Sequence, residues 1–430
     1  MSAQPGPSDQ EAFAQRHLRR NVASLGGDYV FYVIGMAFAS QSTVLTAFAH
    51  HLGAPNVLIG AIPAVSTLGW LLPALFVAGH TESLERKLPF VLKYTAWERA
   101  PYLLLAVLTF VVADRAPGLM LALLLVVLFL TTGVAGVLIP AWTDIVGRAI
   151  PMTLRGRFFA GCTVLSSLGG LGASVVTASV LGAIAAPASY GVCFLGSAVC
   201  MVLSYIALRF TREPPSASPA APSVPLRAYL ARIPDLLRRN RNMAWFLVAR
   251  SFGALGVMSA GFFTVYALRV LGAPAWQVGV FTTLLLAGNL AANVIFGWLA
   301  DRFGHRVVFA AGSAAALVAN AVALASPSLD TFRIVFVLDG VYDAAISVSS
   351  LNILLEMAPT EEARPTYVGL GRTALAPVAF AGPLVAGLLA DTVGFVPVFA
   401  VAMGSSLVAL ILFGARVHEP RGGITTRLRP

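Results

Sequence analysis

Two aspartates four residues apart carry the clearest chemical meaning in this 430-residue sequence. Asp339 and Asp343 lie in a mainly apolar stretch, residues 331–357, with Tyr342 next to Asp343. Residues four apart share one face of a helix, so the two carboxyl groups are expected side by side, with Asp343 near the middle of the stretch. Two like charges on one face in a low dielectric resist being ionised together, which suits a proton carrier. The alternative is a structural pairing of these acids with Arg250 or Arg372.

Three more charged residues interrupt apolar stretches near the start of the chain. Asp28 lies in residues 26–50, and Glu98 and Arg99 lie in residues 89–113. A charge in the middle of a membrane span costs roughly 2.5–3.5 kcal/mol unless it is paired or hydrated. For Glu98 and Arg99 a structural pairing is favoured, with Asp28 as the candidate partner. Asp28 remains a second candidate for the proton or solute site.

Composition indicates where such apolar stretches belong. The sequence is 58% hydrophobic and only 11% charged, with a mean hydropathy of +0.82, whereas soluble domains are about 25% charged. Apolar runs of about 20 residues, enough to cross a bilayer, recur along the whole length. We therefore predict an all-α polytopic membrane protein. The net charge of +10 is interpreted as a topology signal and not as affinity for nucleic acid.

The connector between two of these runs contains an acid, two glycines and a basic cluster, Gly297-Trp298-Leu299-Ala300-Asp301-Arg302-Phe303-Gly304-His305-Arg306. It resembles the loop signature of the major facilitator superfamily, with His305 where that family usually has Arg or Lys. The signature residues in this chain are Gly297, Asp301, Arg302, Gly304 and Arg306. The glycines allow a tight turn between helices.

An internal repeat supports the resemblance. Leu52-Gly53-Ala54-Pro55 recurs as Leu271-Gly272-Ala273-Pro274, an offset of 272 − 53 = 219, which places Glu82 on Asp301. The chain is thus two copies of one unit. The resemblance implies twelve transmembrane helices in two pseudo-symmetric six-helix bundles, with a solute cavity near the midplane and an alternating-access cycle.

The positions of the apolar runs divide the chain into five regions. They are a cytoplasmic tail (1–25), an N-terminal bundle (26–210), a cytoplasmic linker with a basic amphipathic segment (211–242), a C-terminal bundle (243–416) and a cytoplasmic tail (417–430). Most of the Lys and Arg fall in the tails and in the connectors on the side of the tails. Cytoplasmic loops carry this excess, so we predict a multi-pass protein of the cell membrane with both termini in the cytoplasm.

The resemblance assigns the signature to gating of the cycle. Asp144 and Glu356, at the ends of the preceding helices, are placed where they could pair with Arg86 and Arg306 in one access state. An isolated exposed pair contributes only about 0–1 kcal/mol, so such gating would need a desolvated network.

The predicted function is secondary active transport of a small organic solute by alternating access, coupled to protons. No catalytic, nucleotide-binding or metal-ligand pattern is found, so we predict no enzyme activity, metal or cofactor. The expected partners are a small-molecule substrate, protons and the lipid bilayer, without nucleic acid, and the protein is expected to be a monomer. The alternatives are a facilitative uniporter and a non-transporting receptor or scaffold. Direction stays open, although the glycine–proline pattern of many exporters is missing from residues 158–183.

Overall fold

Helices account for the regular structure in a computed structural model of the chain, which describes residues 7–82, 84–214, 233–234, 236–326, 328–361 and 363–420. Two compact units are distinguished by their contacts. The first contains residues 1–40, 51–53 and 65–223, and the second contains residues 41–50, 54–64 and 224–430. Segments 41–50 and 54–64 of the first two spans therefore belong to the second unit.

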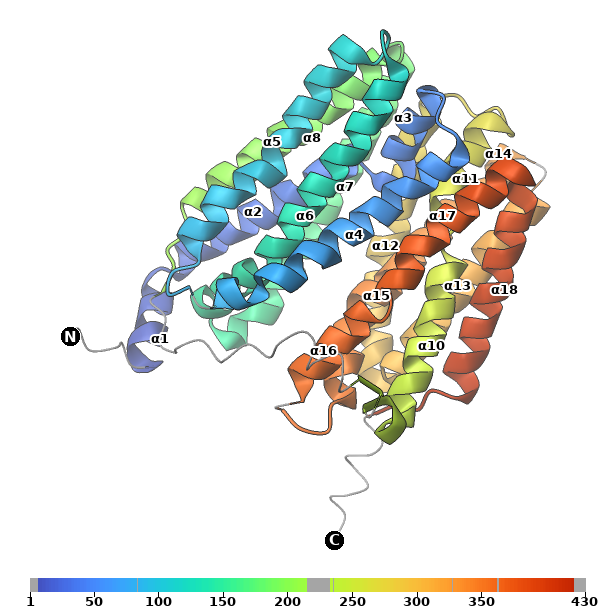
Figure 1. The fold of residues 1–430 in the computed structure, drawn as a ribbon. Helices are drawn as coiled ribbons and strands as arrows, with labels where there is room; N and C mark the ends of the chain where they lie inside the picture. Colours follow the sequence, from blue (N-terminus) through green and yellow to red (C-terminus); the bar gives the residue numbers. More distant parts are fainter. Residues whose placement is uncertain are drawn as a thin grey trace. The chain divides into compact units, whose positions relative to one another are not determined.

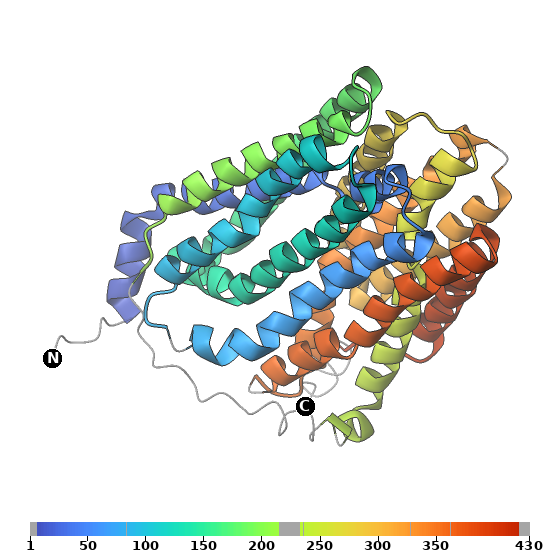
Figure 2. The same cartoon turned by 45° about the horizontal axis from the view of Figure 1, so that its top comes forward.

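The first unit is built from long antiparallel helices, coloured blue to green in Figures 1 and 2. In chain order the helices of the first half are α1 (Pro7–Arg16), α2 (Leu18–Phe38), the π-helical turn η1 (Gln41–Leu45), α3 (Thr46–His51), α4 (Asn56–Glu82), α5 (Leu88–Val112), α6 (Pro117–Ala149), α7 (Met152–Ala183) and α8 (Ala188–Arg209). Helix α8 packs against both α2 and α5, and α5 also packs against α6. This arrangement brings α2, α5, α6 and α8 around one interior.

The second unit repeats this plan with more interruptions. Its helices are α10 (Arg241–Gly256), α11 (Ala260–Arg269), α12 (Gln277–Phe303), α13 (His305–Ala325), α14 (Leu329–Phe332), α15 (Ile334–Met357), α16 (Arg364–Thr373), α17 (Ala376–Thr392) and α18 (Phe395–Ala415). Helix α15 packs against α12 and α13, and α13 packs against α18. Gly288 and Gly340 sit where α12 and α15 meet backbone to backbone, because a Cβ on either would collide with a carbonyl of the other helix.

Eleven described helices are long and apolar enough to cross a membrane, and α4 adds a shorter apolar stretch over 56–71. The prediction of a polytopic all-α protein is confirmed. Three spans that were predicted as continuous helices are interrupted, at Ala39–Ser40, at Val257–Ser259 and at Ala374–Leu375. Most of the amphipathic segment of the linker lies outside the described residues. Its described end packs Ile233 and Leu237 on the buried cluster around Phe246.

Candidate functional site

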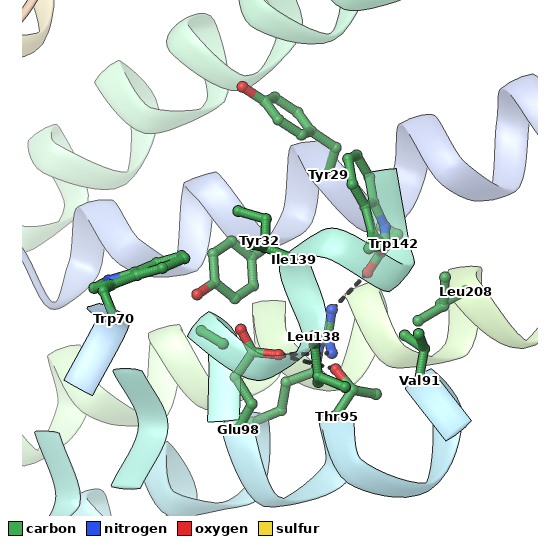
Figure 3. A pocket seen from close by; sticks show the side chains of 13 residues that line it. Tyr29, Tyr32, Trp70, Val91, Thr95, Glu98, Leu138, Ile139, Trp142 and Leu208 are labelled. Atoms are coloured by element: carbon green, nitrogen blue, oxygen red, sulfur yellow. Dashed lines mark hydrogen bonds and ion pairs between the residues drawn. The ribbon is translucent and has the colours of Figure 1, made fainter. Parts of the chain in front are cut away.

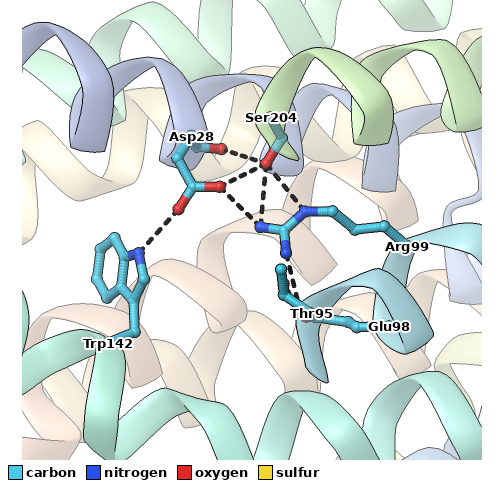
Figure 4. A network of polar contacts seen from close by, with 6 residues as sticks. All are labelled: Asp28, Thr95, Glu98, Arg99, Trp142 and Ser204. Atoms are coloured by element: carbon cyan, nitrogen blue, oxygen red, sulfur yellow. Dashed lines mark hydrogen bonds and ion pairs between the residues drawn. The ribbon is translucent and has the colours of Figure 1, made fainter. Parts of the chain in front are cut away.

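A buried polar cluster joins four helices of the first unit (Figure 4). The Asp28 carboxylate on α2 accepts a hydrogen bond from Arg99 Nη2 on α5 at 2.7 Å and one from Ser204 Oγ on α8 at 2.6 Å. Its other oxygen accepts from Trp142 Nε1 on α6 at 2.8 Å. The expected pairing of Arg99 with Asp28 is therefore confirmed. The cluster ties together the helices that surround the interior of the unit.

Glu98 adds a second acid to this cluster. Its Oε2 accepts a hydrogen bond from Thr95 Oγ1 at 3.0 Å and lies 3.4 Å from Arg99 Nη1, and Tyr32 is a further hydrogen-bond partner. Asp28, Glu98 and Arg99 are 2%, 7% and 7% exposed. One guanidinium therefore faces two carboxyl groups in a low-dielectric interior. With all three groups ionised the cluster carries a net charge of −1, so a proton or a bound cation would complete its charge balance.

The cluster opens into a pocket of about 140 Å³ with aromatic walls (Figure 3). Tyr29, Tyr32, Trp70 and Trp142 line it beside the two acids. The rings of Tyr29 and Trp142 stack with centroids 6.3 Å apart, and the Arg99 guanidinium lies 5.6 Å from the centre of the Tyr32 ring. Drug-sized ligands usually occupy pockets of about 300–1,000 Å³. This pocket therefore has room for one ring or one charged head group, not for a whole drug-sized molecule.

Two glycines allow the helices that line this pocket to pack closely. A Cβ on Gly136 of α6 would collide with the backbone of Trp70 on α4, and a Cβ on Gly69 would collide with Thr132 of α6. Without side chains at these positions α4 can lie directly on α6. That contact places the Trp70 indole across the pocket from Glu98 (Figure 3).

In the second unit, α15 carries the predicted acid pair. Asp339 is 6% exposed, and within the described part of the chain no hydrogen bond or ion pair joins its carboxyl group to another side chain. Asp343, one turn later, has an exposed side chain. The Tyr342 hydroxyl is a hydrogen-bond partner of Arg250 on α10. The pair therefore consists of one acid with a buried side chain and one with an exposed side chain.

Arg250 does not bridge to these acids in the described structure. Its guanidinium lies 4.9 Å from the centre of the Phe309 ring, and the residue lines a second cavity, of about 130 Å³, together with Ser350. The side chain of Arg372, the other predicted partner, lies outside the described residues.

The loop signature forms a tight turn, in which the residue that contacts Glu356 is not the expected one. Gly304 has φ 88° and joins α12 directly to α13, a conformation that favours glycine. Arg306 was expected to pair with Glu356. Instead, His305 is buried and its Nε2 lies 3.6 Å from Glu356, while the Arg306 backbone N–H donates to Glu419 at 2.9 Å. At the start of α13, a step of one residue turns a side chain by 100°, so His305 faces the acid that Arg306 was expected to meet.

The other signature residues lie on the surface. Asp301 and Arg302 are exposed, and the Arg302 guanidinium lies over the Trp298 and Phe303 rings, at 5.7 and 5.6 Å from their centres. A Cβ on Gly297 would meet open space. These positions fit a surface connector.

In the first copy of the signature the partner also differs by one residue from the expected one, but it is the following residue and not the preceding one. The predicted partner of Asp144 was Arg86, but Arg86 is exposed and Lys87 Nζ lies 2.9 Å from the Asp144 carboxylate. Arg148 also pairs with Asp144 and lies 3.1 Å from Glu213. Helix α4 ends at Glu82, whose side chain lies outside the described residues.

Sequence reasoning missed two acids that cap helices in these clusters. The Glu213 carboxylate accepts hydrogen bonds from the backbone N–H groups of Lys87 and Leu88, at 2.8 and 2.9 Å, and so caps α5. Glu419 caps α13 through Arg306. A sequence signal was available, because both acids precede a proline directly after the sixth and twelfth spans, as Glu213-Pro214 and Glu419-Pro420. Sequence reasoning also favoured a purely structural pairing for Glu98, whereas the structure places it in the lining of the pocket.

Comparison with known proteins extends these observations. A sequence model of the Major Facilitator Superfamily matches residues 262–428. The chain is 32% identical over 123 residues to the tetracenomycin C resistance and export protein of Streptomyces glaucescens, covering 28% of this chain and 23% of that protein. It is 30% identical over 146 residues to the multidrug efflux pump LfrA of Mycolicibacterium smegmatis, covering 34% and 28%. The chain thus spans about a quarter of the length of these curated relatives.

Solved structures show the same fold over most of the chain. The nucleoside transporter NupG covers 92% of this chain with a TM-score of 0.61 at 15% identity, and 98% of its own chain is matched. A bacterial homologue of the iron transporter ferroportin, in an inward-facing state, covers 92% with a TM-score of 0.67 at 16% identity, again with 98% of its own chain matched. Residues 262–428 thus match the sequence model of the Major Facilitator Superfamily, and most of the chain has the fold of solved membrane transporters.

Proposed function

We propose that this protein is a proton-coupled secondary transporter that exports an amphipathic organic solute by alternating access. The observation that carries the proposal is the aromatic pocket of the first unit with its two acids and single arginine. Aromatic faces attract cations, and the net negative charge of the cluster favours a cationic head group. The small volume means that the rest of such a solute would bind outside this pocket.

Export is supported by the relatives. Two of the matching proteins are named for export or efflux, and a third, from Bacillus subtilis, for resistance to methylenomycin A. The missing glycine–proline pattern in α7 speaks against export, but α7 contains several glycines that serve close helix packing without proline. Export, as the direction of transport, is therefore proposed together with the function.

The acid pair on α15 is the proposed proton site. An ionised Asp339 would be a buried charge without a described counter-ion, which costs several kcal/mol in a membrane. Asp343 is exposed one helical turn away and could pass a proton between solvent and Asp339. The buried acid and its exposed neighbour together provide an uptake and release path that the arginine-paired Asp28 lacks.

The predicted topology and gating assignments complete the proposal. Both termini lie in the cytoplasm, the protein works as a monomer, and the signature clusters around Asp144 and Glu356 change partners during the cycle. The Asp144 cluster combines three ion pairs with the capped start of α5, and the pair of His305 with Glu356 lies at the capped start of α13, so neither is an isolated surface pair.

Transport in proteoliposomes tests the solute site. We would measure uptake of a fluorescent aromatic cation, and of a neutral and an anionic compound of similar size, with and without a pH gradient. Glu98→Gln should raise the KM for the cation about tenfold or more while changing that for the neutral compound little, because it removes one charge from the pocket. The matched control is Glu361→Gln, whose exposed carboxylate pairs with Arg364, three residues later in the sequence.

Three results would contradict this function. Equal KM changes for the cation and the neutral compound would remove charge recognition from the pocket. Transport that never responds to a pH gradient would favour the facilitative uniporter. A protein that binds the cation without moving it would favour the receptor or scaffold.

A further inference from the structure

The first turn of α4 has an unusual cap. Asn56 and Val57 are its first residues, and their N–H groups have no partner within their own helix. The residue before them is Pro55, whose side chain has no acceptor atom to serve as a cap. Both N–H groups instead donate to the carboxylate of Asp391 at the end of α17, at 2.8 and 2.9 Å. The cap of a helix in the first half of the sequence thus comes from the eleventh span.

Close backbone packing surrounds this cap. One turn before Asp391, a Cβ on Gly387 would lie 2.5 Å from the Asn56 carbonyl oxygen, and one turn after Asn56 a Cβ on Gly60 would collide with the Pro383 carbonyl. Such distances are shorter than any van der Waals contact. Helices α4 and α17 therefore touch through their backbones at the point where the carboxylate binds (Figure 1).

The end of the first span is attached in a similar way. Thr43 Oγ1 hydrogen-bonds Thr282 Oγ1 of α12 at 2.7 Å, and Thr264 Oγ1 of α11 donates to the Ser42 carbonyl at 2.8 Å. These contacts explain why residues 41–50 and 54–64 belong to the second compact unit. The π-helical turn η1 begins at Gln41, where the chain passes from one unit to the other.

We propose that Asp391 is a gating residue, whose carboxylate holds the outer end of the second span against α17 and must release it during transport. The proposal rests on the transport function proposed above. By the predicted topology, the start of α4 and the end of α17 both lie on the outer side of the membrane. An alternating-access cycle that opens to that side has to separate them.

The chemistry of the contact suits repeated opening. Asp391 is exposed, so water can solvate its carboxylate and the freed N–H groups once they part. Two charge-assisted hydrogen bonds at a helix N-terminus hold the closed form, but a lost helix cap changes an equilibrium by only about 2- to 30-fold. A fully buried ion pair would be much harder to break in every cycle.

Cysteine accessibility tests the proposal without requiring transport. In a variant with Cys162, Cys193 and Cys200 replaced, Ala47→Cys would place a thiol at a position that is 1% exposed, inside the attached segment. Its reaction rate with a membrane-impermeant maleimide would be measured in intact cells and in inside-out vesicles. Asp391→Ala should raise the rate in intact cells about 2- to 30-fold, and Asp391→Asn should raise it less.

The control is Asp330→Ala. Asp330 is also exposed and also predicted on the outer side, but it pairs with Arg333 of its own segment, so its loss should leave the rate unchanged. Gly387→Ala is a second variant, because its methyl group should wedge α4 from α17 and raise the rate even if Asp391→Ala fails to fold.

If neither Asp391→Ala nor Gly387→Ala changes the reaction rate with maleimide, Asp391 is not a gating residue. A rise seen only in inside-out vesicles would overturn its placement on the outer side. If the rate rises as expected but the wild type moves no solute, the gate stands and the transport function fails, so the two proposals are tested separately.

Discussion

Replacing Arg99 by methionine tests the energetics of the polar cluster most directly. Arg99 is 7% exposed and is the cation that contacts both Asp28, at 2.7 Å, and Glu98, at 3.4 Å. Methionine has a similar length but no charge, so the variant leaves two buried carboxyl groups without their counter-ion. Removing one partner of a buried ion pair costs about 3–5 kcal/mol. We expect Arg99→Met to destabilise the protein by about this amount.

A double variant separates charge from packing. Adding Asp28→Asn to Arg99→Met removes one of the stranded charges and should recover part of the loss, because uncharged groups of similar volume can replace a buried pair at little cost. Arg364→Met is the control. That arginine pairs with Glu361 on the surface, where such a pair contributes about 0–1 kcal/mol.

The assay uses cysteines that the protein already has. Cys162 and Cys193 are buried and free, so a thiol-reactive dye reports unfolding of the purified protein as denaturant is added. A cost below about 1 kcal/mol for Arg99→Met, or no recovery on adding Asp28→Asn, would refute the interpretation of the cluster as a desolvated ion pair.

Three further predictions concern the transport cycle. Asp343→Asn should preserve solute exchange across proteoliposome membranes but abolish accumulation driven by a pH gradient, because an amide cannot release a proton. Asp339→Asn should shift the pH optimum of transport instead of abolishing coupling. If Asp343→Asn accumulates solute at the wild-type level, the proton-carrying residue lies elsewhere. Asp301→Ala should lower the turnover rate with little change in solute affinity, and a loss confined to affinity would assign Asp301 to binding. A cysteine in the 211–242 linker should be protected from impermeant reagents in intact cells while one near Pro274 is labelled, and the opposite pattern would invert the topology.

The fold could be predicted because the sequence patterns that indicate it extend over many residues. Composition, the recurrence of apolar runs and the repeat around Gly53 and Gly272 each extend over many residues, and both glycines do adopt positive φ, at 77° and 66°. The pairing of Arg99 with Asp28 could also be predicted, because a buried arginine needs an acid and few acids lie in the first bundle.

Single contacts could not be predicted in the same way. Whether Arg86 or Lys87 meets Asp144 depends on the rotation of a helix start by one residue, and both side chains are basic. The pocket depends on Gly69 and Gly136 bringing α4 onto α6, which is a tertiary contact without a local pattern. Asp391 acts on a helix 334 positions away in the sequence, a distance at which periodicity carries no information.

The two units differ in how they balance charge, and this difference bears on the coupling mechanism. In the first unit the acids share Arg99 and line an aromatic pocket. In the second, Asp339 is buried without a described counter-ion and Asp343 is exposed. A solute bound at the first site and a proton bound at the second would have no atoms in common. They could not compete directly, so each would have to favour one state of the protein, and coupling would follow from their different affinities for the two states.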